Sequence, residues 1–526
     1  AKTPQTHREA MSSPEAEQWR AAELKEWNSC EQRGTWDLVP RSSLPQGAKA
    51  IRSKVVYKIK LDQQGNVTEF KARITPKGFM QRAGVDYFDI AAPTGMYKTM
   101  RLGLCLAAHY DLEVDQMDVP SAFLHADLEE DVYMEIPDAY RDGREHLVCK
   151  LKKSLYGLKQ APRNWHLNIK DFVTNQMGYT ATVSDPCLFH RLSRQGRLML
   201  LYLFVDDFQT IYDKRDAAEW NELKALLVKE YQVKDLGPSQ WILGMGIRRD
   251  RKQMKIFLDQ ELYITKALEK YGLAQCKAVA TPECLGKAGT TETQGGSADK
   301  RAYQEIVGTL LYAAISTRPD IAHAVHQLTR RMQDPQVDDM QRAKRVLRYL
   351  SGTKQWCLQF GGRRGGDSDL SMEVSAFADA DFANDVGDRR SVSGWVVKLD
   401  GDPISWSSKK QSIVAQSTCE AELYAEAAAI NEVLWLRGML EELGLLLKAR
   451  SIIYGDNTST QTISREGVKR ERTKHIDVKY HFITECIENG VVQLKWVATD
   501  QQQADIFTKA LDRVKFETHR KELMSC

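Results

Sequence analysis

The segment at residues 197–212, RLMLLYLFVDDFQTIY, constrains this chain more than any other stretch. An apolar run from 198 to 205 stops at two adjacent carboxylates, Asp206 and Asp207, and a shorter alternating segment follows. The β-branched and aromatic residues on both arms predict a β-hairpin with its charge at the tip. Asp is also a common turn residue, so the pair alone favours an ordinary surface turn. A metal site would need at least one more carboxylate from elsewhere in the chain.

Length and composition set the broad class of protein. A chain of 526 residues is too long for one compact core, and we expect about three to four domains. With 42% hydrophobic and 28% charged residues, the composition is typical of a soluble globular protein. The net charge of +3 gives no strong global field, so a nucleic-acid partner would need a local basic surface.

The cysteines and the apolar runs argue against several other classes. The ten cysteines are scattered, with no CxxC pair and no His at zinc-finger spacing, so neither a disulfide framework nor a structural zinc site is indicated. This usage favours a reducing, intracellular setting. No apolar run approaches the roughly 18 residues that a membrane span requires, and we therefore expect no membrane partner.

Two segments upstream of the hairpin bear on the metal hypothesis. Residues 112–117 alternate as a strand that ends on Asp118 and then turns, a position suited to holding a metal ion and its phosphates. Asp118 is therefore the predicted third carboxylate. Residues 50–75 predict a twisted hairpin whose basic residues form either a solvated face or, beside a polymerase site, contacts to phosphates. These basic residues are Lys54, Lys58, Lys71, Arg73 and Lys77.

Two segments rich in small polar residues, 286–297 and 361–371, predict linkers, and the second is the clearest domain boundary in the chain. The stretch between them, at 303–349, is predicted to be helical. Its basic residues recur about every three positions and would share one face, which is either solvated or a nucleic-acid track. They are Arg342, Lys344, Arg345 and Arg348.

Beyond residue 371 the pattern changes to three strands followed by alternating helices and strands, which predicts a mixed sheet with helices packed on it. The predicted strands are 374–378, 392–399, 403–407, 451–454 and 491–497, and the predicted helices are 417–443, 473–489 and one from 504 onward. Four carboxylates fall at strand ends or helix starts, where acids also gather for structural reasons. As a set they predict a site for two hard cations that clamp a phosphate. They are Asp379, Glu422, Asp456 and Asp505.

Motifs recur in a fixed order along nearly the whole chain. They are KARITPKGF (71–79), GVDYFDIAAP (84–93), DVPSAFLHADL (118–128), SLYGLKQAPRNW (154–165), FVDD (204–207), ILGMGI (242–247), ADADFAND (378–385), SWSSKKQ (405–411), STCEAELYAEA (417–427), YGDNTS (454–459), RTKHIDVKYHFI (472–483) and QQADIFTKAL (502–511). In this order they resemble the reverse transcriptase and RNase H portion of a Copia-type (Pseudoviridae) LTR retrotransposon Pol polyprotein.

The resemblance implies an α+β multidomain fold, with a right-hand polymerase of fingers, palm, thumb and connection. An RNase H-like α/β domain with a mixed five-stranded sheet would follow. The implied boundaries are 1–235 for fingers and palm, 236–300 for primer grip and thumb, 301–372 for connection and linker, and 373–526 for RNase H.

The resemblance also assigns roles to residues. The metal ligands of the polymerase would be Asp118, Asp206 and Asp207, and those of RNase H would be Asp379, Glu422, Asp456 and Asp505. Phe123 matches a steric gate against the ribose 2′-hydroxyl, Lys71 and Arg73 would contact the triphosphate, Tyr156 and Gly157 would line the nucleotide pocket, and Leu243, Gly244 and Met245 would form the primer grip. Pro120 departs from the family pattern and removes one backbone N–H that could have met a phosphate.

The implied function is an RNA-directed DNA polymerase with a linked ribonuclease H, using two Mg²⁺ ions, or Mn²⁺ in their place, at each site. Its partners would be an RNA template, a DNA or tRNA primer, the RNA/DNA hybrid and dNTPs. The integrase of the same element is a further candidate partner, and monomer or homodimer is left open. The implied location is the cytoplasm, within virus-like particles.

Two alternatives to this function stay open. One is a domesticated or inactive element product that binds nucleic acid without turnover, and the other is a chain with RNase H activity alone. The presence of all seven predicted acids argues against a decayed product.

Overall fold

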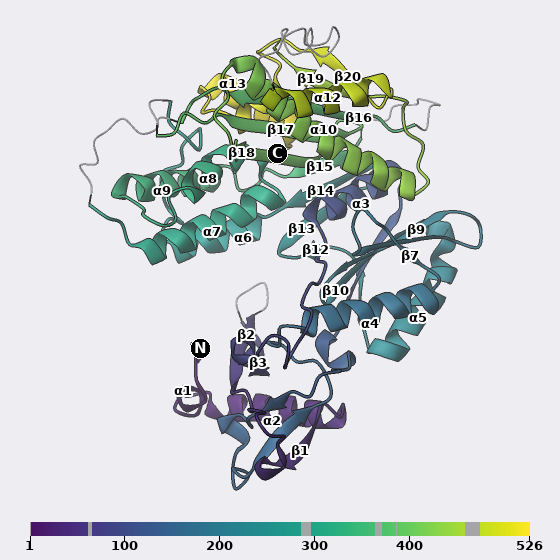
Figure 1. Cartoon of the computed structure of the whole chain (residues 1–526), viewed down its shortest axis with the longest axis vertical. Coiled ribbons are helices and arrows are strands. Elements are labelled where there is room, and N and C mark those ends of the chain that lie inside the picture. Colours follow the sequence, from purple (N-terminus) through teal and green to yellow (C-terminus); the bar gives the residue numbers. More distant parts are fainter. Residues whose placement is uncertain (1, 62–65, 286–295, 363–370, 386, 458–473) are drawn as a thin grey trace.

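The computed structural model describes residues 2–61, 66–285, 296–362, 371–385, 387–457 and 474–526. This part of the chain is a mixed α/β structure with several sheets. The N-terminal elements lie at the bottom of Figure 1 and the last sheet lies at its top, with two further sheets between them. The two predicted linkers fall mostly outside the described residues.

The N-terminal elements pack helices on the predicted hairpin, which is present as β2 and β3. Trp19 of α2 packs edge-on against Tyr57 and Phe70 of the hairpin, with ring centroids 5.2 and 4.8 Å apart. A small separate sheet has the order β1-β6-β5. The bounds are α1 His7–Met11, α2 Ala16–Gln32, β1 Trp36–Pro40, β2 Ser53–Leu61, β3 Val67–Pro76, β5 Tyr133–Met134 and β6 Leu147–Leu151.

The central sheet is antiparallel, with the order β11-β4-β10-β9-β8-β7. Its strands alternate between two buried cores, because successive side chains of a strand point to opposite faces. Leu200 and Tyr202 join the core on the α3 side, whereas Leu201 and Leu203 join the core under α4 and α5. The bounds are α3 Tyr97–His109, β4 Glu113–Asp118, α4 Ala161–Asn175, β7 Thr180–Ala181, β8 Leu188–Leu192, β9 Leu198–Phe204, β10 Asp207–Tyr212, α5 Ala217–Tyr231 and β11 Lys234–Pro238.

A four-stranded sheet, β12-β13-β14-β15, follows and carries a group of helices. The helical stretch predicted at 303–349 is three α-helices, because Pro319 and Pro335 lie at its interruptions. Two residues of the predicted basic face bond to the preceding segment of the chain. Arg345 donates a hydrogen bond to the Thr281 hydroxyl, and Arg348 donates one to the Lys277 carbonyl. The bounds are β12 Trp241–Ile242, β13 Met245–Asp250, β14 Lys255–Asp259, α6 Glu261–Lys270, α7 Lys300–Ser316, α8 Ala322–Thr329, α9 Val337–Gly352 and β15 Leu358–Gly361.

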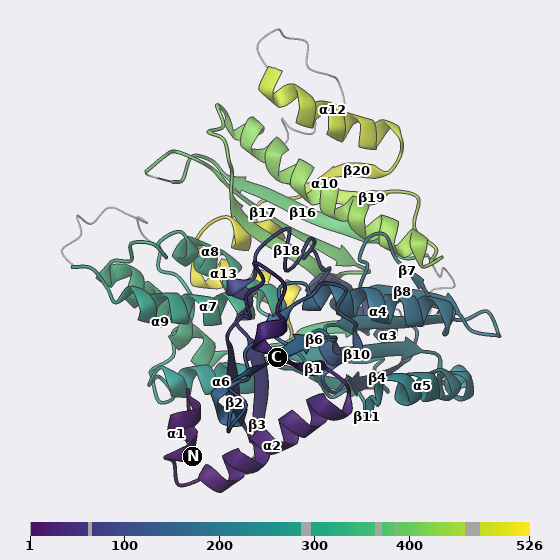
Figure 2. The same ribbon diagram turned by 60° about the horizontal axis from the view of Figure 1, so that its bottom comes forward.

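The last sheet has five strands in the order β18-β17-β16-β19-β20, with β16, β19 and β20 parallel and the others antiparallel. Figure 2 shows α10 running along this sheet with α12 beside it. The predicted start of the last helix, at residue 504, is wrong. Residue 504 lies in a 3-10 turn, η7, and α13 begins only after its capping residue Asp512. The bounds are β16 Val374–Asp381, β17 Val392–Leu399, β18 Asp402–Lys410, α10 Thr418–Glu442, β19 Ser451–Gly455, α12 Lys474–Glu488, β20 Val492–Trp496, η7 Gln503–Phe507 and α13 Arg513–Leu523.

One hydrophobic core joins the two halves of the chain. Leu104 of α3, Leu258 of β14 and Val396 of β17 belong to the same buried cluster and are each 0% exposed. Helix α3 and the last sheet are therefore packed on one shared core. Among the described helices, none combines the length and the apolar content that crossing a bilayer would take.

Candidate active sites

The first acidic cluster is built by the pairing of β4 with β10. The register sets Asp118 opposite Asp207, and the backbone N–H of Val119 donates to the carbonyl of Asp206 at 2.8 Å. Asp206 lies in the turn between β9 and β10, as the sequence predicts for a hairpin tip. Three carboxylate residues from separate positions are thus held at one end of the central sheet.

The turn before Asp206 has an unusual backbone. Val205 has a positive φ of 57°, a conformation that costs a residue with a side chain about 1–2 kcal/mol. The indole Nε1 of Trp165, on α4, donates to the carbonyl of Val205 at 2.6 Å and so holds this turn. Neither residue was singled out from the sequence for this contact, because no local pattern links α4 to the hairpin.

The charges of this cluster act on one another. Burial, followed by the negative charges of Asp206 and Asp118, raises the pKa of Asp207 to about 6. Two polar side chains touch the cluster: Gln116 Nε2 donates to Asp207 Oδ1 at 3.4 Å, and the Tyr156 hydroxyl donates to Asp206 Oδ2 at 3.5 Å. Clustered, partly buried carboxylates are a donor set that suits hard divalent cations.

The predicted nucleotide-binding residues lie beside this cluster as a stack. The ring centroid of Phe123 lies 4.4 Å from that of Tyr156. The Arg73 guanidinium lies over the same tyrosine ring, 4.3 Å from its centroid. A Cβ on Gly157, whose φ is 113°, would lie 2.5 Å from the Pro76 carbonyl oxygen, so this position requires glycine. Lys71 lies two residues before Arg73 on β3, and burial together with the Arg73 charge lowers its pKa.

The predicted primer grip is the tight turn between β12 and β13. Leu243 and Gly244 have positive φ values of 50° and 79°, as a two-residue hairpin turn requires. The Tyr312 hydroxyl of α7 donates to the Leu243 carbonyl. The ring of Tyr97 lies 6.2 Å from that of Tyr312 and 6.1 Å from that of Phe204, so aromatic contacts link this turn to the acidic hairpin. Met245, the third predicted residue, is fully buried.

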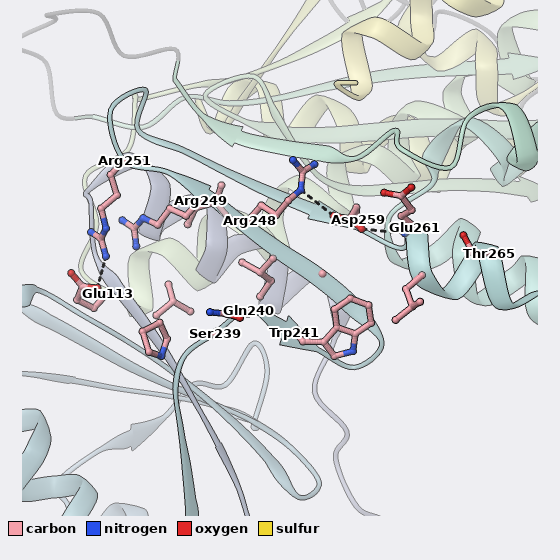
Figure 3. A pocket seen from close by; sticks show the side chains of 16 residues that line it. Glu113, Ser239, Gln240, Trp241, Arg248, Arg249, Arg251, Asp259, Glu261 and Thr265 are labelled. Carbon is pink, nitrogen blue, oxygen red and sulfur yellow. Dashed lines mark hydrogen bonds and ion pairs between the residues drawn. The ribbon is translucent and has the colours of Figure 1, made fainter. Parts of the chain in front are cut away.

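A cavity of about 1000 Å³ lies behind the β12–β13 turn (Figure 3). Trp241 and Thr265 line one part of it, and Arg248 and Arg251 line another. Both arginines pair with acids, Arg248 with Asp259 at 3.4 Å and Arg251 with Glu113 at 2.5 Å. These pairs neutralise the basic wall of the cavity.

The second acidic cluster lies at one edge of the last sheet. Asp379 of β16, Glu422 of α10 and Asp456, just after β19, bring carboxylate oxygens within 4.8 Å of one another. Burial raises the pKa of Asp379 to about 7 and, with the charges of Asp379 and Asp456, raises that of Glu422 to about 10. Burial and mutual repulsion thus favour the protonated forms of Glu422 and Asp379, and a bound cation would oppose this by favouring their ionised forms.

Asp505, the fourth predicted acid, is fully buried in η7 and is held by two lysines. Lys509 Nζ lies 2.8 Å from Asp505 Oδ1 and 3.7 Å from Asp379 Oδ2, and Lys515 forms a further ion pair with Asp505. Burial would raise the pKa of Asp505, but the two ammonium groups outweigh it and lower that pKa. Lys509 was not singled out from the sequence, although its spacing of four residues from Asp505 is a signal for such a pair.

The chain has clear relatives among known proteins. Residues 33–284 match the family described as reverse transcriptase (RNA-dependent DNA polymerase). The Retrovirus-related Pol polyprotein from transposon TNT 1-94 of Nicotiana tabacum is 40% identical over 98% of this chain and 38% of its own length. A transposon Ty5-1 protein of Saccharomyces cerevisiae is 32% identical over 60% of this chain and 100% of its own length.

The chain thus spans well under half the length of the tobacco polyprotein it matches. Among solved structures, the foamy viral protease-reverse transcriptase in complex with RNA/DNA hybrid overlays with a TM-score of 0.49 at 10% identity. That overlay covers 93% of this chain and 54% of the viral chain.

Proposed function

This chain belongs to the reverse transcriptase family of Copia-type retrotransposon Pol polyproteins, and on that premise we propose that it is an RNA-directed DNA polymerase with a linked ribonuclease H. One observation carries the polymerase half of the proposal: the strand register sets Asp118 opposite Asp207, with Asp206 beside them at the hairpin tip. Carboxylates brought to one end of a buried sheet are the donor groups that two-metal phosphoryl transfer would use.

In the proposed reaction, Asp118, Asp206 and Asp207 would hold two Mg²⁺ ions, or Mn²⁺. When bound, such ions lower the pKa of a primer 3′-hydroxyl and neutralise charge on the triphosphate. The other residues would position the nucleotide. Arg73, held flat against Tyr156, would present its guanidinium to the phosphates, with Lys71 farther along the same strand. The β12–β13 turn would support the primer strand.

The RNase H half rests on the second acidic cluster. Asp379, Glu422, Asp456 and Asp505 would hold two divalent ions that activate water and stabilise the leaving oxygen when bound. The raised pKa values of Asp379 and Glu422 support this fit, because added positive charge is what would let both ionise. The substrate would be the RNA strand of an RNA/DNA hybrid, read through its groove shape and 2′-hydroxyls.

The wider assignments follow from the same proposal. Residues 1–235 would be fingers and palm, 236–300 primer grip and thumb, 301–372 connection and linker, and 373–526 RNase H. The RNA template, a DNA or tRNA primer, dNTPs and the element's integrase would be its partners, and virus-like particles its location. The relatives named above are transposon proteins, which supports a retrotransposon origin for these partners.

Primer extension on poly(rA)/oligo(dT) with Mg²⁺ tests the proposal against its main alternative, binding without turnover. The parent chain should extend the primer, and Asp206→Asn should not. If the parent extends no better than the variant while both bind the duplex, the chain is a nucleic-acid-binding product. If the parent only cleaves hybrid RNA, the alternative of RNase H activity alone is correct.

Replacing the predicted gate residue should change sugar selection. Phe123→Val removes the ring beside Tyr156, so a ribose 2′-hydroxyl would no longer clash, and we expect ribonucleotide use relative to deoxynucleotide to rise about 10- to 200-fold. The measurement is the ratio of kcat/KM for the two nucleotides. Phe123→Tyr, which keeps the ring, is the matched control and should keep the parent ratio. An unchanged ratio in an active Phe123→Val enzyme would refute the gate.

The dependence of hybrid cleavage on Mg²⁺ should vary with pH. Glu422 and Asp379, with pKa values raised to about 10 and about 7, hold protons that a bound cation must displace. Raising the pH removes those protons, so the half-saturating Mg²⁺ concentration should fall, by up to about tenfold per pH unit for each proton released. The measurement is a Mg²⁺ titration at each pH, and a half-saturating concentration that does not change with pH would contradict the prediction.

For primer extension, the half-saturating Mg²⁺ concentration should stop falling at a lower pH than for hybrid cleavage, because the pKa of Asp207 is raised only to about 6.

A further inference from the structure

A third group of metal-binding side chains lies away from both acidic clusters. Cys105, His109 and Asp402 each offer a ligand atom, and these atoms all lie within 4.8 Å of one another. Cys105 is 0% exposed, and the side chains of His109 and Asp402 are 1% and 0% exposed. Cys105 and His109 lie on α3, and Asp402 is the first residue of β18. The three side chains therefore come from distant parts of the chain.

The distances from Asp402 to the other two ligand atoms fit zinc. Cys105 and His109 lie one turn apart on the same face of α3. The Cys105 Sγ lies 3.6 Å from Asp402 Oδ2, and His109 Nε2 lies 3.1 Å from the same oxygen. Tetrahedral zinc with ordinary bond lengths sets sulfur–oxygen and nitrogen–oxygen separations of about 3.5 and about 3.3 Å. Two sides of the ligand triangle therefore already have nearly the required lengths, and the third, between Cys105 and His109, is within 4.8 Å.

The surrounding groups orient two of these ligands. His109 Nδ1 lies 3.7 Å from Asp400 Oδ2, on the side of the ring opposite Asp402. A histidine that binds a metal through one nitrogen commonly directs the other to a carboxylate, which fixes the ring and its tautomer. The backbone N–H of Gly361 donates to Asp402 Oδ2 at 2.7 Å, as second-sphere donors do for metal-bound carboxylates.

The same face of α3 already docks on β18. Arg101, four residues before Cys105, donates to the Ile404 carbonyl at 2.7 Å and lies 4.1 Å over the Trp406 ring. Cys105 and His109 continue this face toward the start of β18. A metal ion here would fasten the far end of an interface that is already held at its near end by Arg101.

We propose that Cys105, His109 and Asp402 form a structural zinc site that clamps α3 to β18. Thiolate and imidazole ligands favour Zn²⁺ over Mg²⁺, which prefers oxygen alone. Structural zinc sites usually have a fourth protein ligand, whereas these three side chains would leave one tetrahedral position to a water molecule. The sequence-based rules missed the site because they detect ligands at short spacing, and Asp402 is 297 residues from Cys105.

Metal content and cobalt spectroscopy test this site independently of any catalytic activity. The full chain, stripped with a chelator and reloaded with Zn²⁺, should retain about one zinc per chain after dialysis against excess Mg²⁺, which competes for the acidic clusters. Reloading with Co²⁺ should give a thiolate-to-cobalt charge-transfer band. Cys105→Ala should lose both signals, whereas Cys149→Ala, at another buried cysteine, should keep them.

Thermal melting supplies a second measurement, because a ligand that binds only the folded state raises its stability. Zn²⁺ should raise the Tm of the parent and of Cys149→Ala, and leave that of Cys105→Ala and His109→Asn unchanged. Absence of the cobalt band in the parent would overturn the proposal, even if Cys105→Ala does not fold. An equal zinc response in all variants would overturn it too, and the three side chains would then form a hydrogen-bonded cluster without metal.

Discussion

Asp206→Asn should lower primer extension by about 10³-fold or more and leave the fold unchanged. The carboxylate lies in the turn between β9 and β10, outside the strand ladders, so an amide of the same size disturbs no backbone pairing. What is lost is the charge that holds the metal ions, whose stabilisation of the transition state is worth several kcal/mol. The measurement is single-turnover extension of an oligo(dT) primer on poly(rA).

Asp207→Asn is the matched comparison for this prediction. Asp207 is paired in β10, accepts a hydrogen bond from Gln116 and has a pKa raised to about 6, so burial and neighbouring negative charge oppose its ionisation. We therefore expect a smaller loss at this position. Primer binding and Tm should match the parent in both variants. Equal loss of primer extension in the two variants would show that Asp206 is not the more important metal ligand.

The local part of the first site could be predicted from the sequence, and its long-range part could not. The apolar arms and the acidic tip at 197–212 predicted the β9–β10 hairpin because both signals are contained in one stretch. The placement of Asp118 opposite Asp207 depends on the register of β4, which is set by packing on both sheet faces. The hold of Trp165 on Val205 likewise depends on where α4 packs.

The second site shows the same limit in a different form. The strands and the long helix that carry Asp379 and Glu422 follow from periodicity and from the capping Ser417, whose side chain accepts from the Glu420 N–H. The turn that carries Asp505 could not be predicted from the sequence, because its 3-10 conformation is stabilised by burial and by two lysine contacts. Local propensity is weak where tertiary contacts decide the backbone.

Asp456→Asn should lower the rate of hybrid cleavage by about 10³-fold, while the rate of primer extension stays at the parent level. Asp456 is the cleanest position for this test, because it follows β19 and remains partly exposed. Asp379, by contrast, accepts a hydrogen bond from Thr508 at 2.5 Å and lies 3.7 Å from Lys509, so its replacement would also disturb η7. Loss of one ligand weakens metal binding and with it the stabilisation of charge on the scissile phosphate.

The reciprocal variant makes this prediction specific. Asp206→Asn should cleave the RNA strand of a preformed hybrid at the parent rate, and Asp456→Asn should extend primers at the parent rate, since each acid belongs to a separate cluster. The double variant should lose both activities and still bind the hybrid. If Asp456→Asn cleaves as well as the parent at saturating Mg²⁺, the second cluster is not the cleavage site. If it loses extension as well, the two sites are coupled through the shared core that joins α3 to the last sheet.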